Sequence, residues 1–269
     1  MGSPVEDFAT LMKLEPHGSD VFVGLSPDYW WGRVYGGQVI AQGLRAAMAT
    51  VDPDHLVHSV HAYFIRGGNS DEPIRFEVDR IRNGRSFITR RVVARQSEGA
   101  ILNLSCSFQV VEDQIDVQES SLPTDVGKPG SGTNEDWGLL ARRVVHRGDR
   151  RASSWMKVAG PLGDDPILQA CAVAYASDDL ATTAVGTSHP RIAEVDLGNS
   201  TFGDIFIGAS LDHSIWFHRS APADEWQLHE FRSHGLTGGR GLTIGEIFAS
   251  DGTHVATVAQ DVLIRERTR

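Results

Sequence analysis

The most restrictive feature of this 269-residue sequence is an internal duplication. HSVHAYFIR at residues 58–66 resembles HSIWFHR at residues 213–219, and NGRSFITRRVVARQSEGAILNLS at 83–105 parallels GGRGLTIGEIFASDGTHVATVA at 238–259. A duplication of this kind indicates two copies of one supersecondary unit. Each copy reads as a helix followed by four strands, so we expect an α+β protein. Each helix would be wrapped by a curved antiparallel sheet, and the two sheets would join edge to edge, which removes exposed edges.

The elements of the two copies can be placed from periodicity and turn signals. A helix is expected at residues 36–48, where apolar residues recur at helical spacing, and strands follow over 56–111 with a hairpin turn at Asn83-Gly84. An Asp N-cap and a proline open a second helix over 164–182, and four more strands follow it. The polar stretch from 112 and the unassigned stretch up to 163 separate the copies. We therefore divide the chain into an N-terminal repeat at 1–111, a linker and connecting segment at 112–163, and a C-terminal repeat at 164–269.

Charge and cysteine usage exclude several kinds of partner. The net charge of −10 argues against binding to nucleic acid or to an anionic membrane, because neutralising phosphates needs surplus Lys and Arg. Cys106 and Cys171 lie in apolar runs and are expected to be buried reduced thiols, which fits a reducing cytosol. No apolar run reaches the roughly 18 residues of a membrane span. A cytoplasmic protein with no membrane or nucleic-acid partner is expected.

Six motifs of this chain resemble those of a known family. YGGQVIAQGLRAA, LVHSVHAYFIRGG, RNGRSFITRRVVA, LDHSIWFHR, RGLTIGEIF and VATVAQDVLIR occur in the order and spacing of the acyl-CoA thioesterase II family, and the resemblance spans residues 12–265. It implies a double hotdog fold and hydrolysis of acyl-CoA to a free fatty acid and coenzyme A, with no metal and no organic cofactor. Two hotdog repeats already form a pseudo-dimer, and further pairing into a homo-oligomer is expected by symmetry.

The resemblance also implies a catalytic site in which an Asp, a Ser or Thr, and a Gln hold the attacking water. The Asp would be Asp212, in the stretch SLDHSIWFH, and the Gln would be Gln260. The hydroxyl position falls on His234, so this region departs from the family pattern. Ser233 and Thr237 are the nearest hydroxyls, and His234 itself is a third candidate for the water ligand.

The residues by themselves leave alternatives open. Asp212 could instead belong to an Asp–His relay or be a capping or strand-end carboxylate, and Gln260 could be a buried amide satisfied by backbone groups. His213 and His218 are interpreted as packing or hydrogen-bonding residues. The first copy has Val57 at the position of Asp212, so one complete site per chain is expected.

Candidate substrate contacts follow from the chemistry of a thioester that carries phosphates. The developing oxyanion needs donors, and Gly36-Gly37 at a helix start permits close approach to free N–H groups. Arg85 belongs to a local arginine cluster that is suited to phosphate, and Arg240 lies at the equivalent point of the second copy; a solvated sheet face is the alternative interpretation. His58 is a further candidate. With His61 it forms HxxH, but residues three apart on a strand face opposite ways, so no shared metal is expected.

Two other functions remain as alternatives. Hotdog folds also support hydratases, but that chemistry usually uses a His beside the helix, and here the helix start has Gln38. A non-hydrolytic acyl-CoA-binding protein stays open because of the departure around Ser233. No G-x-S-x-G motif occurs, which disfavours a hydrolase with a nucleophile elbow.

Overall fold

The computed structural model describes residues 7–194 and 202–267. In the first half the described elements are α1 (Phe8–Leu11), β1 (Glu15–Pro16), β2 (Val21–Gly24), α2 (Gly36–Met48), β3 (His55–Phe64), β4 (Ile74–Asn83), β5 (Phe87–Gln96) and β6 (Gly99–Val110). In the second half they are β7 (Thr133–Asn134), β8 (Leu140–Gly148), β9 (Arg151–Val158), α3 (Pro166–Ala176), α4 (Ala181–Gly186), α5 (Pro190–Glu194), α6 (Phe202–Ile205), β10 (Phe206–Ser210), β11 (Asp212–Phe217), β12 (Gln227–Thr237), β13 (Arg240–Ala249) and β14 (His254–Glu266).

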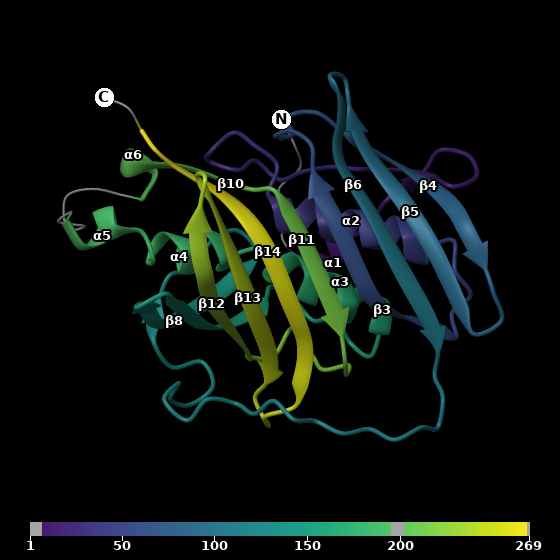
Figure 1. Ribbon diagram of the computed structural model, residues 1–269. Coiled ribbons are helices and arrows are strands. Elements are labelled where there is room, and N and C mark those ends of the chain that lie inside the picture. The colour runs from purple at the N-terminus through teal and green to yellow at the C-terminus, as the bar shows by residue number, and fades with distance from the viewer. Residues whose placement is uncertain (1–6, 195–201, 268–269) are drawn as a thin grey trace.

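The described strands form one antiparallel sheet whose order repeats outward from its middle (Figure 1). The central pair is β3 and β11, joined in register at Val60 and Ile215. From this pair the order is β6, β5, β4, β2 on one side and β14, β13, β12, β9 on the other. The duplication in the sequence is therefore matched by a repeated strand order, and the two sheets meet edge to edge.

Helix α2 occupies the range predicted for the first helix, and it lies against the first sheet and against α3. Its apolar positions Val39, Ile40 and Leu44 are buried in the core. Burial of an apolar helix face is the main source of stability for such a helix. Its N-terminus at Gly36 lacks a side-chain cap, so its first N–H groups are available to other partners.

The helix predicted over 164–182 is interrupted, which corrects that prediction. Asp165 caps α3 by accepting from the Ile167 N–H at 2.9 Å, and Pro166 opens the helix as expected. The helix ends at Ala176, and the chain turns before α4 begins at Ala181. Apolar spacing continues through this turn, so periodicity alone does not reveal it. The turn carries two consecutive carboxylates, Asp178 and Asp179.

Part of the segment predicted as a connection belongs to the second sheet. Strands β8 and β9 pair with each other, and β9 pairs with β12. The stretch before them lies along the outer side of this sheet, where Val126 packs with a small cluster around Trp155 and its carbonyl accepts from the indole N–H at 3.0 Å. A buried ion pair between Arg151 and Glu230 lies beside it. This stretch thus seals the outer face of β9 and β12.

The structure bears on two expectations from composition, the state of the cysteines and the length of apolar helices. Cys106 and Cys171 are free thiols and both are buried, as predicted. Within residues 7–194 and 202–267, no helix combines the length and the apolarity needed to cross a membrane.

Candidate active site

A kink between β10 and β11 brings two polar side chains to the interior face of the sheet. Ser210 pairs with Val262 and Ser214 pairs with Ala259, so four residues of this strand oppose three of β14. The extra residue is a β-bulge, which breaks the alternation of faces along a strand. Ser210 and His213 consequently both point inward, although residues three apart on a regular strand would face opposite ways.

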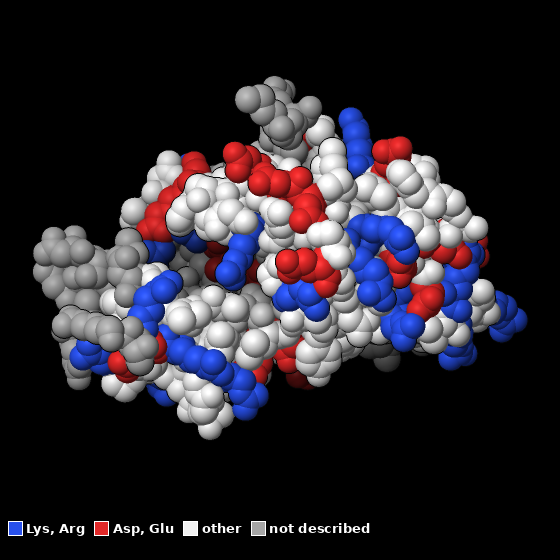
Figure 2. Space-filling view, turned by 90° about the horizontal axis from the view of Figure 1, so that it is seen from above, with Lys and Arg blue, Asp and Glu red and all other residues white. Residues whose placement is uncertain are grey.

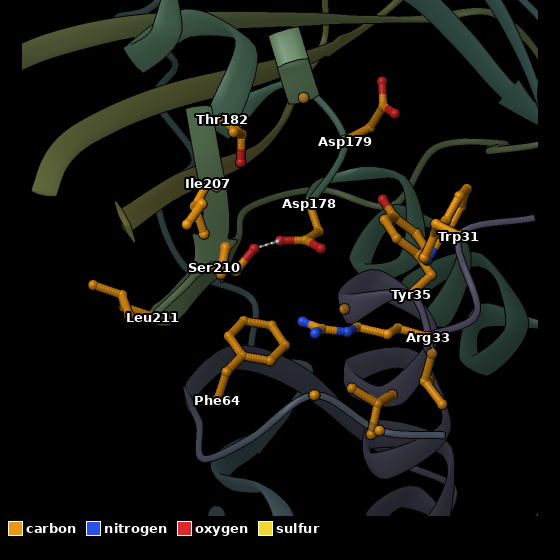
Figure 3. A pocket seen from close by; sticks show the side chains of 18 of the residues that line it. Trp31, Arg33, Tyr35, Phe64, Asp178, Asp179, Thr182, Ile207, Ser210 and Leu211 are labelled. Atoms are coloured by element: carbon orange, nitrogen blue, oxygen red, sulfur yellow. Dashed lines mark hydrogen bonds between the residues drawn. The ribbon is translucent and has the colours of Figure 1, made fainter. Parts of the chain in front are cut away.

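These side chains meet a buried amide and a buried carboxylate. Gln260, with none of its surface exposed, donates from Nε2 to Asp178 Oδ1 and to Ser210 Oγ, both at 2.8 Å. Ser210 Oγ donates to the same Asp178 oxygen at 2.9 Å, the bond drawn in Figure 3. Gln260 comes from β14, Ser210 from β10, and Asp178 from the turn that follows α3. Three separate elements therefore build one cluster.

His213 sets the orientation of the Gln260 amide. Its Nδ1 lies 2.6 Å from Gln260 Oε1 and its Nε2 lies 2.8 Å from Ser177 Oγ. An amide oxygen only accepts, so Nδ1 carries the proton and Nε2 is the acceptor. Burial lowers the pKa of His213 to about 4, so the ring is neutral at physiological pH. With Oε1 held by His213, the NH₂ group of Gln260 must face Asp178.

Asp178 is the buried carboxylate of this cluster. Burial raises its pKa to about 6, while hydrogen bonds from Ser210 and Gln260 and from the Gly37 N–H oppose the rise, and the charge of Asp179 adds to it. The glycines at the start of α2 allow the contact with Asp178. A Cβ on Gly36 would overlap Asp178 Oδ2, and a Cβ on Gly37 would overlap the Tyr175 carbonyl. The helix start of the first half thus meets the helix end of the second.

A large cavity opens onto this cluster. Its volume is about 1260 Å³, and Gly36, Asp178 and Ser210 are among its lining residues. Apolar and charged residues share the wall, and the side chain of Arg33 extends across it (Figure 3). Figure 2 shows basic and acidic side chains around a hollow on the face of the molecule seen from above. Other lining residues are Phe64, Ile65, Arg66, Trp137, Phe206, Ile207, Leu211 and Arg267.

The structure does not bring Asp212 together with Gln260. Because His213 points inward, its neighbour Asp212 points to the opposite face. There the Asp212 Oδ1 accepts from the Asp261 backbone N–H at 2.8 Å. Asp212 is a partly exposed strand-end carboxylate, which was one of the alternative interpretations.

The three hydroxyl or imidazole candidates on β12 also lie apart from the cluster. Ser233 pairs with Thr243, which pairs with Gln260, so Ser233 is two strands away, about 10 Å. Its Oγ is buried with no partner among the described residues. His234 and Thr237 are exposed beyond it.

Of the remaining predicted contacts, Gly36 lines the cavity, whereas Gly37, His58, Arg85 and Arg240 are not among its lining residues. The His58 ring lies edge-on to the Phe87 ring. The pKa of His58 is lowered, first by burial and second by the charge of the nearby His61. Arg85 is exposed at the β4–β5 turn, and Arg240 pairs with Asp261 at 3.1 Å.

Three arginines of the cluster around Arg85 are neutralised locally. Arg80 pairs with Asp20, Arg91 with Asp79, and Arg95 with Glu77. This arrangement favours the solvated sheet face over a phosphate site there.

The HxxH pair lies beside an irregularity of β3. A bulge between Val57 and Ser59 interrupts the alternation of faces next to His58, so His58 and His61 need not lie on opposite faces. Among the residues that the structure describes, no three His, Cys, Asp or Glu side chains gather closely enough to hold a metal ion.

Sequence reasoning missed Asp178 and Ser210. Two consecutive Asp residues at the end of an otherwise apolar helix were a usable signal, since buried carboxylates are costly unless hydrogen-bonded or functional. Ser210 opens the stretch SLDHSIWFH, but its inward direction depends on the bulge, for which the sequence has no clear mark.

Comparison with solved structures defines the class of fold. A protein from Alicyclobacillus acidocaldarius described as having a hot dog fold superposes with a TM-score of 0.75 at 19% identity, covering 97% of this chain and 98% of that one. An acyl-CoA thioesterase II from Mycobacterium marinum superposes with a TM-score of 0.83 at 34% identity, covering 97% and 98% of the two chains. The chain therefore has a hotdog-type fold.

Sequence comparison then defines the family. The acyl-CoA thioesterase N-terminal domain family matches residues 26–109, and the C-terminal domain family matches residues 116–264. Acyl-CoA thioesterase 2 of Haemophilus influenzae is 32% identical over 98% of this chain and 99% of its own length. Human acyl-coenzyme A thioesterase 8 is 30% identical over 95% and 88%. The chain belongs to the acyl-CoA thioesterase II family, which confirms the resemblance seen in its motifs.

Proposed function

We propose that this protein hydrolyses acyl-CoA thioesters to a free fatty acid and coenzyme A, with Asp178, Ser210 and Gln260 as its catalytic residues. The observation that carries this proposal is the convergence of Gln260 and Ser210 on one oxygen of a buried carboxylate that lines a large cavity. The names of the full-length relatives support the reaction class. Gln260 keeps the role that the resemblance implied, and Asp178 takes the role first expected of Asp212.

The chemistry follows from the geometry around Asp178. Its Oδ1 is held by Gln260 and Ser210, and its Oδ2 lies toward Gly36. A water held by Asp178 gives up one proton to the carboxylate while its oxygen bonds to the thioester carbon. The C–S bond then breaks, and the thiolate of coenzyme A takes the proton from Asp178. A base with a pKa of about 6 is ionised at neutral pH and still accepts a proton readily.

The start of α2 is suited to the developing oxyanion. Free N–H groups and the helix dipole coincide at this end of the helix. The Gly37 N–H already serves Asp178, so we assign the Gly36 N–H to the carbonyl oxygen of the substrate. This assignment keeps Gly36 as a substrate-binding residue, whereas Gly37 holds the proposed base.

The cavity wall suggests how the substrate lies. Phe64, Ile207 and Leu211 supply apolar surface for an acyl chain. Arg33 is exposed and reaches across the cavity, and within the described parts of the chain no carboxylate forms an ion pair with it. We therefore assign Arg33, rather than Arg85 or Arg240, to the phosphates of coenzyme A.

The proposal extends to the arrangement of the repeats, the location of the protein and its assembly. The repeated strand order supports a double hotdog with repeats at 1–111 and 164–269, to which the connecting segment contributes β8 and β9. The buried free thiols support a cytoplasmic location. The proposal also includes pairing into a homo-oligomer, which is expected by symmetry, and a reaction without a cofactor, which the family resemblance implies.

Release of coenzyme A from a panel of short to long acyl-CoAs tests the function. We expect turnover by the wild type, and a loss of about a hundredfold or more in Asp178→Asn. Asp212→Asn is the matched control and should keep wild-type kcat. The reverse pattern would return the role to Asp212. A wild type that binds acyl-CoA but releases no coenzyme A from any chain length would indicate the binding protein, and hydration of crotonyl-CoA would indicate the hydratase.

A further inference from the structure

Asp179 follows the proposed base directly but faces away from it. Its Oδ1 accepts from the Trp137 indole N–H at 2.9 Å, and its Oδ2 accepts from Arg142 Nη1 at 2.7 Å. Only 6% of the Asp179 side chain is exposed. Figure 3 shows the Asp179 side chain turned away from Asp178. Two carboxylates on adjacent residues in such a site repel each other unless one of them is neutralised.

Both terminal nitrogens of the Arg142 guanidinium group donate to carboxylates. Its Nη1 reaches Asp179, its Nη2 donates to Glu135 Oε2 at 2.8 Å, and 15% of its side chain is exposed. Burial works to lower the pKa of Arg142, but the charges of Asp179 and Glu135 raise it overall. Arg142 therefore stays charged and joins β8 to the turn that carries Asp178.

Other charged or titratable groups lie on the turn of Asp178, on the elements packed against it and along the cavity. Asp179 is on the same turn, and Arg33 extends across the cavity. His213 is neutral and acts through Gln260. The remaining ones are the phenols of Tyr35 and Tyr175 and the cavity-lining Arg66, Glu135, Asp136, Arg142 and Arg267. Of the cations in this set, only Arg142 forms an ion pair with Asp179 among the described residues.

We propose that Arg142 is a positioning residue that acts through Asp179: it holds the Asp179 carboxylate away from Asp178 and offsets its charge, and so sets the pH at which the catalytic base ionises. Asp179 works in the opposite sense, because its negative charge keeps Asp178 basic. Arg142 and Asp179 therefore shift the pKa of Asp178 in opposite directions. This inference rests on the proposed function, in which Asp178 accepts a proton from water.

The test is the acid limb of kcat against pH in four variants. Arg142→Gln leaves Asp179 uncompensated, so we expect the midpoint of the limb to rise by about half to one pH unit. Asp179→Asn removes the negative charge, so the midpoint should fall by a similar amount. The double variant should return close to the wild-type midpoint, as expected for two coupled charges. Arg142→Lys keeps the charge and should stay near the wild type.

Opposite shifts in the two single variants, restored in the double variant, support the tuning role. A purely structural role predicts a lower plateau with no shift of the midpoint, or shifts in the same direction, and either result overturns the inference. Partial misfolding does not obscure the result, because the midpoint does not depend on the fraction of active enzyme. Asp178→Asn, measured in parallel, separates the two levels: full activity in that variant refutes the proposed function, whereas an inactive Asp178→Asn with unmoved midpoints refutes only the role of Arg142.

Discussion

Gly36 lies against Asp178 so closely that a Cβ on the glycine would overlap Oδ2 of the carboxylate. The two residues are in different halves of the duplicated chain: Gly36 opens α2, and Asp178 follows α3. The proposed active site is therefore assembled between the two copies.

The contact between Gly36 and Asp178 predicts the effect of adding a methyl group at position 36. In Gly36→Ala the Asp178 carboxylate must move, and misplacement of a catalytic group by about 1 Å can cost up to about a hundredfold in rate. We expect kcat to fall by about ten- to a hundredfold with little change in the far-UV circular dichroism spectrum. Gly43→Ala is the control, since the one atom that its Cβ would overlap is a terminal methyl group of Leu104. Equal losses in both variants would indicate general damage to α2.

The raised pKa of Asp178 predicts the pH dependence of turnover. A general base acts when it is deprotonated, so kcat should be full well above pH 6 and fall about tenfold per unit below it. His213, with a pKa of about 4, stays neutral through this range and should not contribute. The measurement is kcat from pH 4.5 to 8.5 at saturating substrate. A plateau that continues down to pH 5 would contradict the role of Asp178.

The hydrogen bond from His213 to Gln260 predicts that a smaller N–H donor at position 213 preserves part of the activity. His213→Leu removes the Nδ1 proton and frees the amide to turn its oxygen toward Asp178, so kcat should fall about tenfold or more. His213→Asn keeps an N–H donor near the same place and should retain more activity. His218→Leu is the control, because His218 directly follows β11 and hydrogen-bonds to Thr257 instead. Equal activity in the Leu and Asn variants of His213 would show that the orientation of Gln260 does not depend on this donor.

The assignment of Arg33 to the phosphates of coenzyme A predicts a change in binding. Arg33 is exposed, so the ionic contact is worth about 1 kcal/mol or less, and Arg33→Ala should raise KM by up to about fivefold at low salt with kcat nearly unchanged. Added salt should shrink the difference from the wild type. Arg85→Ala removes an equally exposed arginine outside the cavity and should leave KM unchanged. A KM effect in Arg85→Ala alone would move the phosphate site to the outer sheet face.

His229 is a buried histidine outside the proposed site, and it predicts how the free energy of unfolding depends on pH. Burial lowers the pKa of His229 to about 3, against about 6.5 in an unfolded chain. Its stabilising effect is complete above pH 6.5 and is lost as the pH falls toward 3, because the unfolded chain then binds a proton that the folded chain excludes. At pH 5 the loss is about 2 kcal/mol. Urea unfolding at pH 5 and 7.5 should show a smaller difference for His229→Leu than for the wild type, and no such reduction for the exposed His17→Leu.

Much of the fold could be predicted from local patterns and repetition. The helix at residues 36–48 was predicted at its observed bounds, because apolar spacing and a glycine start are properties of the chain itself. The family membership followed from motifs along the chain. Gln260 was predicted for the site; it lies against Asp178, and its catalytic role stays a prediction. The turn between α3 and α4, by contrast, interrupts no apolar pattern, and the strands β8 and β9 lacked a clear alternation.

The choice of Asp178 as the proposed catalytic carboxylate rests on tertiary structure. Which face Ser210, Asp212 and His213 occupy depends on a bulge that exists only because this strand pairs with β14. Whether Asp178 becomes a buried base depends on the start of α2, which lies some 140 residues earlier in the chain. The sequence by itself determined the repeat and the family, because these are carried by residues in fixed order. The direction of a side chain and the burial of a carboxylate are properties of packing, and only the folded chain specifies them.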